Sequence, residues 1–261
     1  MRLSILKDKI NNNQGLQDEN NTIDNVDTSK AVIDLLIKKG AMEPDFNETR
    51  MRDELLQIIA AGVETTALTV SFLMLMLAIN QDIQFYFTPL QQKVHEEITS
   101  LTIDCNGLSE NDLTNHLRYL EQCIKETLRM FSPVIVTSRR INKEIILKDN
   151  KIIPAGMFVA TFIHLSNYDP DLYENPQKFD PEHFNDQAVQ KRNKNSQLSF
   201  GYGPRSCIGA KYAMMSIKTQ IAYILRNYHL STSIKEFTKE HLTMDLSIRS
   251  KVGYPIKFTS R

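Results

Sequence analysis

Residues 200–209 read Phe200-Gly201-Tyr202-Gly203-Pro204-Arg205-Ser206-Cys207-Ile208-Gly209, which places one cysteine in a glycine-rich turn. The apolar pattern after this turn predicts a long helix, and the positive end of a helix stabilises a thiolate that precedes it. Glycines let the backbone turn tightly and approach a bound group closely. Arg205 adds a cation two residues before the thiol, where it suits an anionic partner. The stretch therefore predicts a thiolate that serves as a ligand.

Cys207 also has a simpler interpretation. Most lone cysteines are buried core residues, and a free thiol beside a glycine-rich turn would be one of them. The full spacing F-G-x-G-x-R-x-C-x-G favours the thiolate site, because it sets an aromatic side chain, a cation and three glycines around the same sulfur.

A second pattern is Glu126-x-x-Arg129, in a segment with helical periodicity from Tyr119 to Phe131. Residues three apart share a helix face, so the carboxylate and the guanidinium can meet. Such pairs are common on solvated faces, and the pair alone would indicate no more than that. Pro133 ends the helix, and Arg139 lies beyond it.

A third pattern lies in the long apolar segment before that helix and reads Ala61-Gly62-Val63-Glu64-Thr65-Thr66. Glycine and β-branched threonines go against helix propensity, and threonine hydroxyls can bond back to the preceding turn. Local rules broken in this way often mark a functional site. A partly buried Glu64 with a raised pKa would suit proton transfer.

The same segment could instead span a membrane, because Glu64 is the only charge between Ile58 and Ile79. A carboxylate in mid-span is costly, and three threonines, a glycine and a serine also fall in the segment. With the other two patterns present, we expect a long core helix.

The bulk composition excludes several classes. The 261 residues carry 31 basic and 31 acidic side chains, so no excess of positive charge points to nucleic acid. The three cysteines, Cys105, Cys123 and Cys207, form no C-x-x-C pair, which argues against a zinc ribbon or a disulfide framework and suits a reducing compartment. Residues 1–30 are polar and contain no apolar run of signal or anchor length.

Periodicity and turn residues predict a mainly helical chain with small β pieces after the middle. The predicted helices are residues 31–39, ended by Gly40, then 48–80, 82–100 with a break at Pro89, one from Ser109, 119–131 and 210–228. The predicted strands are 144–147 with 151–153 as a hairpin, 157–163, and a terminal pair of 242–248 with 254–259.

The three patterns occur in the order found in the C-terminal, haem-binding half of cytochromes P450, and the chain resembles that family from about Ala31 to its end. Lys125-Glu126-Thr127-Leu128-Arg129 and the Gly-Pro-Arg loop look like the microsomal type. The resemblance implies a mainly α fold with small β-sheets (α+β), a long central helix and a cysteine haem loop. It divides the chain into a polar segment, 1–30, and a partial cytochrome P450 domain, 31–261.

The resemblance also assigns a haem site. Cys207 is expected to ligate the iron of heme b, and Arg205 and Arg139 to bind its propionates, with Arg140 as the alternative to Arg139. Phe200 and Gly201 are expected beside the macrocycle.

In the long helix, the resemblance assigns Thr65 to handling oxygen and Glu64 to relaying protons. Ala61 is expected to lie beside the cofactor, at the position where some relatives carry a glutamate that esterifies the haem, so no such ester is expected here.

Glu126 and Arg129 are expected to hold the core under the haem together with a residue of the later stretch Phe179-Asp180-Pro181-Glu182-His183-Phe184. The family usually has P-E-R-F there, and His183 stands at the arginine position. A histidine has at most two donors and no planar fork, so this network should be weaker and pH-sensitive.

The implied activity is a haem-thiolate monooxygenase. It would insert one oxygen atom of O2 into an apolar small molecule, such as a fatty acid, steroid or xenobiotic, with electrons from NADPH-cytochrome P450 reductase. Lys211 is a candidate contact for that partner, although it also suits a solvated helix position. Full-length relatives lie on the endoplasmic reticulum membrane by an anchor that we do not expect in this chain.

Two alternatives stay open at this stage. The chain is about half the usual family length, and a truncated, catalytically inactive fragment would carry the same motifs, with or without haem binding. A member that rearranges a peroxide without a reductase is the other alternative, and the Glu64-Thr65 pair argues against it, because such enzymes need no proton relay to dioxygen.

Overall fold

The computed structural model describes residues 32–42, 47–80, 90–101, 107–193, 195–245 and 247–261. The chain divides into two compact units, 1–61 and 62–261. The first contains α2 (Val32–Met42) and the beginning of α3 (Glu48–Ile79), whose second half belongs to the other unit. The predicted division at residues 30 and 31 stays a prediction, and residues 1–30 lie outside the described part.

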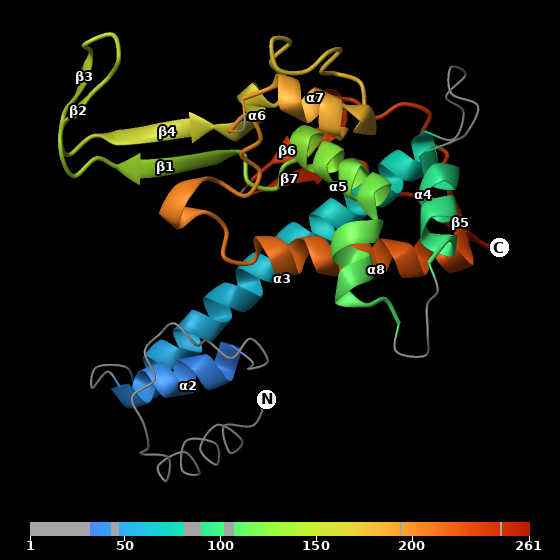
Figure 1. Cartoon of the computed structure of the whole chain (residues 1–261), viewed down its shortest axis with the longest axis horizontal. Helices are drawn as coiled ribbons and strands as arrows, with labels where there is room; N and C mark the ends of the chain where they lie inside the picture. Colours follow the sequence, from blue (N-terminus) through green and yellow to red (C-terminus); the bar gives the residue numbers. More distant parts are fainter. Residues whose placement is uncertain (1–31, 43–46, 81–89, 102–106, 194, 246) are drawn as a thin grey trace. The chain divides into compact units, whose positions relative to one another are not determined.

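The second unit is mainly helical, as expected from the sequence (Figure 1). Its longest complete helices are α5 (Arg118–Met130) and α8 (Ala210–Asn227). The shorter ones are α4 (Leu90–Thr99), η1 (Asp112–His116), α6 (Ile163–Ser166), η2 (Pro181–Phe184), α7 (Asp186–Lys191), η3 (Gly203–Arg205) and η4 (Lys239–His241).

In the described residues, the strands form four antiparallel pairs. A ribbon of β1 (Val136–Arg140) and β4 (Phe158–Phe162) projects from the helices, with β2 (Ile145–Ile146) and β3 (Ile152–Ile153) at its far end (Figure 1). In that ribbon Arg139 lies opposite Val159. The C-terminal pairs are β5 (Tyr228–Ser231) with β8 (Lys257–Ser260), and β6 (Leu242–Met244) with β7 (Ile248–Ser250).

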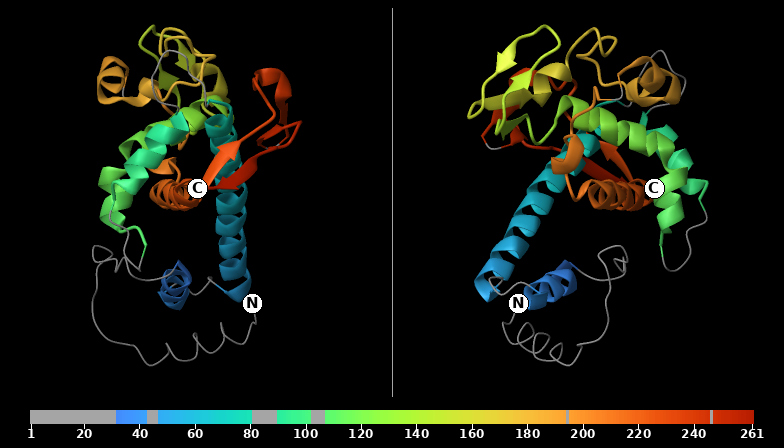
Figure 2. Two further views of the ribbon diagram at one scale, coloured as in Figure 1. Left: turned by 90° about the vertical axis from the view of Figure 1, so that its right-hand side faces the viewer. Right: turned by 60° about the vertical axis from the view of Figure 1, so that its left-hand side comes forward.

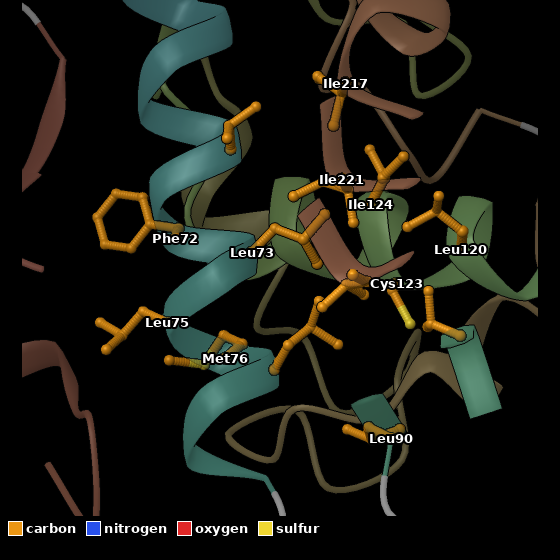
Figure 3. Packing of buried hydrophobic residues seen from close by; sticks show 14 of the residues in the cluster. Phe72, Leu73, Leu75, Met76, Leu90, Leu120, Cys123, Ile124, Ile217 and Ile221 are labelled. Atoms are coloured by element: carbon orange, nitrogen blue, oxygen red, sulfur yellow. The ribbon is translucent and has the colours of Figure 1, made fainter. Parts of the chain in front are cut away.

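The core lies where the second half of α3 meets α5 and α8 (Figure 3). Phe72 and Leu73 of α3 are fully buried, as are Ile124 of α5 and Ile221 of α8. The C-terminal strands lie beside α3 (Figure 2), and the ring of Phe72 meets that of Tyr254 edge to face, with centroids 5.1 Å apart. Helices whose apolar stripes face one another in this way exclude water from a common core.

Helix α3 is long and apolar enough to cross a membrane by length and composition, with a third of its most apolar window buried within the protein. Core helices of soluble proteins pass the same test. Because the stretch from Leu68 to Ala78 contributes a large part of the buried core, the prediction of a core helix suits this second half of α3.

Several expected element boundaries were wrong. Gly40 lies inside α2 and does not end it. Strand β1 was not predicted, because Val136 to Arg140 has only one apolar residue for a strand-like alternation. The two C-terminal segments do not pair with each other: β6 pairs with β7, and β8 pairs with β5. The apolar pattern over 242–248 does not show that this one segment contains two strands, β6 and β7, which pair with each other. The predicted break at Pro89 lies outside the described residues.

Candidate functional site

A pocket of about 230 Å³ opens in the second unit between the cysteine loop, α3 and the β1–β4 ribbon. Its lining is mostly apolar and includes Leu128, Ile163 and Ile217. It is also lined by six residues that the sequence predicted for the cofactor and oxygen site, namely Thr65, Arg139, Phe200, Gly201, Arg205 and Cys207. The fold thus brings together residues that lie far apart in the sequence.

The cysteine loop is closed by its own backbone. The amide of Cys207 donates to the carbonyl of Phe200 at 2.8 Å, and the amide of Ser206 donates to the carbonyl of Gly203 at 3.0 Å. Gly201 and Gly203 have φ angles of +72° and +77°, which residues with a Cβ rarely adopt. The loop leads directly into α8, so Cys207 stands near the positive end of that helix, with its thiol exposed.

The predicted cationic residues approach the pocket from two directions. Arg205 comes from η3 in the cysteine loop, and Arg139 comes from β1. The guanidinium of Arg139 donates from Nη1 to the neighbouring carbonyl of Ser138 at 2.8 Å, and both side chains are exposed. Arg140 is on the next position of the strand, whose side chain points to the opposite face of the ribbon. Strand alternation therefore favours Arg139 over Arg140.

Helix α3 presents threonines to the pocket. Thr65, Thr66 and Thr69 line it, and the Thr69 hydroxyl donates to the carbonyl of Thr65 at 2.8 Å. Thr69 lies outside the pattern of residues 61–66, so back-bonding by the hydroxyls of Thr65 and Thr66 stays a prediction. Ala61 belongs to the first unit, where it is an exposed residue of α3, and its assignment to the cofactor stays a prediction.

Glu64 is directed to the C-terminal strands. Its Oε1 accepts a hydrogen bond of 2.6 Å from the hydroxyl of Ser247 and another from Nη2 of Arg249. These hydrogen bonds, that of Ser247 first, hold the pKa of the Glu64 carboxyl below its usual value. The expectation of a raised pKa was therefore wrong, because it assumed burial without a charged partner.

The Glu126–Arg129 pair is fully buried. Nε and Nη2 of Arg129 each lie 2.8 Å from a different carboxylate oxygen of Glu126, which is the bidentate geometry of a strong ion pair. The remaining guanidinium hydrogens go to the backbone carbonyls of Asn167, Pro176 and Lys178. The pair therefore ties α5 to the loop before η2.

His183 joins this network from η2. Its Nδ1 lies 3.1 Å from Oε1 of Glu126, and its Nε2 lies 2.6 Å from the carbonyl of Glu174. Both partners are acceptors, so both ring nitrogens must carry hydrogen, and only the imidazolium cation has two N–H groups. Burial opposes this charge, but the hydrogen bond and the charge of Glu126 outweigh it and raise the pKa of His183. The histidine thus acts as a second cation on the carboxylate.

Three features of the site went unpredicted. Arg129 binds backbone carbonyls. Every residue has a backbone carbonyl, so the sequence does not indicate which ones Arg129 contacts. Thr137 of β1 and Val134, just before that strand, line the pocket, and β1 was not predicted. The Glu64 partners are Arg249 of β7 and Ser247 just before that strand, and nothing in the sequence pattern indicated either contact. Lys211, the candidate partner contact, is exposed and lies 2.7 Å from the carboxylate of Glu110.

The side chains of the pocket fit a haem. A thiol stands in a loop before a helix, two guanidinium groups suit propionates, and apolar walls suit a macrocycle. A Cβ on Gly209 would lie 3.9 Å from the Cys207 sulfur, so a small residue leaves space around the thiol.

Comparison with known proteins also indicates a haem protein. The family model for cytochrome P450 matches residues 5–257. The chain is a cytochrome P450. Members of this family are haem monooxygenases in general, so the chain belongs to a family of oxidoreductases that use haem iron.

The curated relatives are other cytochromes P450. The chain is 31% identical to cytochrome P450 4g15 and to cytochrome P450 4g1 of Drosophila melanogaster, over 95% of its own length in both cases. It is also 31% identical to cytochrome P450 4X1 of Mus musculus over 81% of its length. The matched region makes up 42%, 44% and 40% of these relatives, so the chain spans less than half of their length.

Proposed function

We propose that this chain is the haem-thiolate part of a monooxygenase that inserts one atom of dioxygen into an apolar small molecule. NADPH-cytochrome P450 reductase would supply the electrons, and fatty acids, steroids and xenobiotics are the substrate classes considered. The observation that carries the proposal is that Cys207, Arg205, Arg139 and Thr65 line one apolar pocket. When bound, haem supplies the oxygen-activating iron, and a thiolate ligand favours O–O cleavage there.

The cofactor residues have separate tasks in this proposal. Cys207 ligates the iron through its thiolate, and the positive end of α8 helps to keep the sulfur ionised. Arg205 and Arg139 line the pocket and would bind the propionates. Phe200 and Gly201 lie beside the macrocycle, the first to exclude water and the second to allow close approach.

Other residues act on oxygen, protons or the scaffold. Thr65 lines the pocket and would handle oxygen there. Glu64 would relay protons. Glu126, Arg129 and His183 join α5 to η2 and the loop before it, and they would hold the scaffold of the cofactor site. Association with the endoplasmic reticulum membrane and a role of Lys211 in binding the reductase are parts of the same proposal.

The test is the reduced, carbon-monoxide difference spectrum of the purified chain after addition of haem. We expect a thiolate-type Soret absorption that Cys207→Ala loses. Cys123→Ala is the matched control, because Cys123 is a free thiol buried in the core, away from the pocket, and this variant should keep the signal.

The outcome decides between the proposal and its alternative. No haem uptake, or a spectrum unchanged in Cys207→Ala, would contradict the haem-thiolate assignment and leave an inactive fragment or interaction module. A thiolate spectrum without product formation in the presence of reductase and NADPH would leave a haem-binding module.

A further inference from the structure

A second cavity, of about 660 Å³, lies in the same unit and is larger than the pocket of about 230 Å³ at the cysteine loop. Its walls are the ends of α3 and α5, the segment before η2 and residues 235–240, and it shares no lining residue with the pocket at Cys207. Small-molecule sites in proteins have volumes of about 300–1,000 Å³. The proposed function gives this cavity no task. We call it the α3–α5 cavity.

The floor of the α3–α5 cavity is apolar. It contains Met76 of α3, Met130 and Phe131 at the end of α5, and Phe179, all of which are buried. The ring of Phe131 stacks on that of Phe72 with centroids 4.6 Å apart, so this part of the floor is held by packing. Methionine side chains adapt to the shape of an apolar group that lies against them. The floor therefore suits a flexible hydrocarbon chain.

Polar groups in the walls already have partners within the protein. The hydroxyl of Tyr168 donates to the carbonyl of Met130 at 2.9 Å, and the side-chain amide of Asn80 donates to the carbonyl of Met76 at 2.8 Å. A hydrocarbon chain in the cavity can replace water there without leaving either carbonyl unpaired. Polar recognition of a ligand is thus left to the rim.

The rim carries charges of both signs from one short segment. Lys235 and Lys239 line the cavity together with Glu236 and Glu240, and all four residues are exposed. None of these four side chains has an ion-pair or hydrogen-bond partner among the described residues. A head group with a single charge would meet a like charge as well as an opposite one, whereas a head group with both charges can pair with both kinds.

We propose that the α3–α5 cavity binds a zwitterionic amphiphile, with a single acyl chain and a head group that carries a phosphate and an ammonium. The acyl chain lies against Met76, Met130 and Phe131, the phosphate pairs with the two rim lysines, and the ammonium pairs with the two rim glutamates. This site is separate from the residues proposed to hold haem. The inference therefore goes beyond the proposed function and does not depend on it.

The test uses octylphosphocholine as the probe, below its micelle concentration, on the full chain with ¹³C-labelled methionine methyl groups observed by NMR. Met76→Leu and Met130→Leu conserve volume and assign the two resonances. We expect both resonances to shift in the wild type as the probe binds, and that of Met51, in the first unit, to stay unchanged. Hexylphosphocholine should bind roughly 15-fold more weakly, because two buried methylene groups are lost.

Double variants test the two kinds of rim charge. Lys235→Gln with Lys239→Gln removes the partners of the phosphate, and Glu236→Gln with Glu240→Gln removes those of the ammonium. Each double variant should raise the Kd of octylphosphocholine roughly fivefold, because two exposed ion pairs are lost. The exposed positions of these side chains make unfolding unexpected, and circular dichroism checks it. An unchanged Kd in both double variants would overturn the assignment of the rim.

Glu144→Gln with Lys148→Gln is the matched control, because both residues are exposed near the end of the β1–β4 ribbon, and it should leave the Kd unchanged. Nonanoate and octyltrimethylammonium carry the same octyl chain with one charge each, and both should bind more weakly than octylphosphocholine. Binding of either that is as tight would overturn the zwitterionic head group.

The cavity itself and the source of the amphiphile are tested separately. No shift of the Met76 and Met130 resonances with octylphosphocholine would overturn the site. Sedimentation of the chain with phosphatidylcholine vesicles, without those shifts, would indicate a bilayer surface and would also overturn a single-chain ligand. Because the titration needs no cofactor, absence of a thiolate spectrum would contradict the haem proposal and leave this site in place.

Discussion

Arg129 holds Glu126 from one turn along the same helix, with two nitrogens each 2.8 Å from a carboxylate oxygen and neither side chain exposed to solvent. Burial opposes ionisation of Glu126, but the hydrogen bonds from Arg129 and His183 outweigh it and keep the pKa of the carboxyl below its usual value. The pair is therefore charged, dry and fully bonded, and each partner depends on the other.

Removal of one partner of this pair should be strongly destabilising. Arg129→Met leaves the Glu126 carboxylate buried with one cation fewer, and the three backbone carbonyls that Arg129 binds lose their donor. We expect a loss of about 3–5 kcal/mol in the free energy of unfolding. Urea unfolding followed by circular dichroism measures it. Lys151→Met, which breaks the exposed pair with Asp149, is the control and should cost nothing measurable. Equal effects of the two changes would contradict the structural role of Arg129.

The stability of the chain should depend on pH through His183. Its pKa is raised in the folded state, so its contribution is fully present below the unfolded value of about 6.5 and is lost as pH rises through the folded value. Glu126 has a lowered pKa, so its contribution is present above the unfolded value of about 4.3 and is lost as pH falls through the folded value. Stability from this network should be greatest between those two unfolded values.

His183→Arg is the informative variant for that dependence. An arginine keeps its charge at alkaline pH, so the variant should lose the decline in unfolding free energy on the alkaline side. The measurement is a series of urea titrations from acid to alkaline pH. His229→Gln, an exposed histidine on β5, should retain the wild-type dependence. An alkaline decline that persists unchanged in His183→Arg would exclude His183 as its source.

The buried lysine Lys218 joins three elements, and it should contribute more to the free energy of unfolding than the partly exposed Lys125. Nζ of Lys218 in α8 donates at 2.6 Å both to the carbonyl of Leu113 and to the carboxylate of Glu121, whereas Lys125 reaches Glu121 from a partly exposed position. Lys218→Met should cost about 1–3 kcal/mol, since it leaves a buried carbonyl unpaired. Lys125→Met should cost about 0.3–0.5 kcal/mol. Unfolding titrations of both variants test the ranking, and a larger loss in Lys125→Met would refute it.

Two glycines should respond oppositely to alanine. Gly203 has a φ angle of +77°, so Gly203→Ala should cost about 1–2 kcal/mol through backbone strain. Gly62 lies within α3, and within the described part of the chain nothing stands within 4 Å of where its Cβ would be. Gly62→Ala should therefore stabilise the chain by about 0.5–1 kcal/mol. A Gly62→Ala variant that is less stable than the wild type would contradict this expectation.

The sequence was most informative where residue type alone determines behaviour. The glycine-rich turn around Cys207 and the helical spacing of Glu126 and Arg129 both led to the observed local structure, because each depends on contacts within a few residues. The long helix followed from its apolar pattern.

Contacts between distant segments were harder to foresee. The Glu64 partners could not be predicted, because the residues around Glu64 in the helix do not indicate which distant segment its carboxylate contacts. The pairing of β5 with β8 was also missed, because pairing partners depend on the path of the chain and not on local composition. His183 is a mixed case: the substitution and its pH-sensitivity were visible in the sequence, but its second acceptor, the Glu174 carbonyl, was not.

The backbone closure of the cysteine loop has a consequence for tolerance to mutation. The bonds from Cys207 to Phe200 and from Ser206 to Gly203 join main-chain atoms, so only proline at Cys207 or Ser206 would remove their donors. Ile208, which is 99% exposed, and Tyr202, which is 69% exposed, contribute little packing to the loop. Random substitution at these two positions should leave the thiol in place, whereas the positive-φ glycines should accept almost none. The loop thus has positions that determine its backbone conformation and positions whose side chains can vary. A library of loop variants selected only for haem retention would distinguish the two kinds of position.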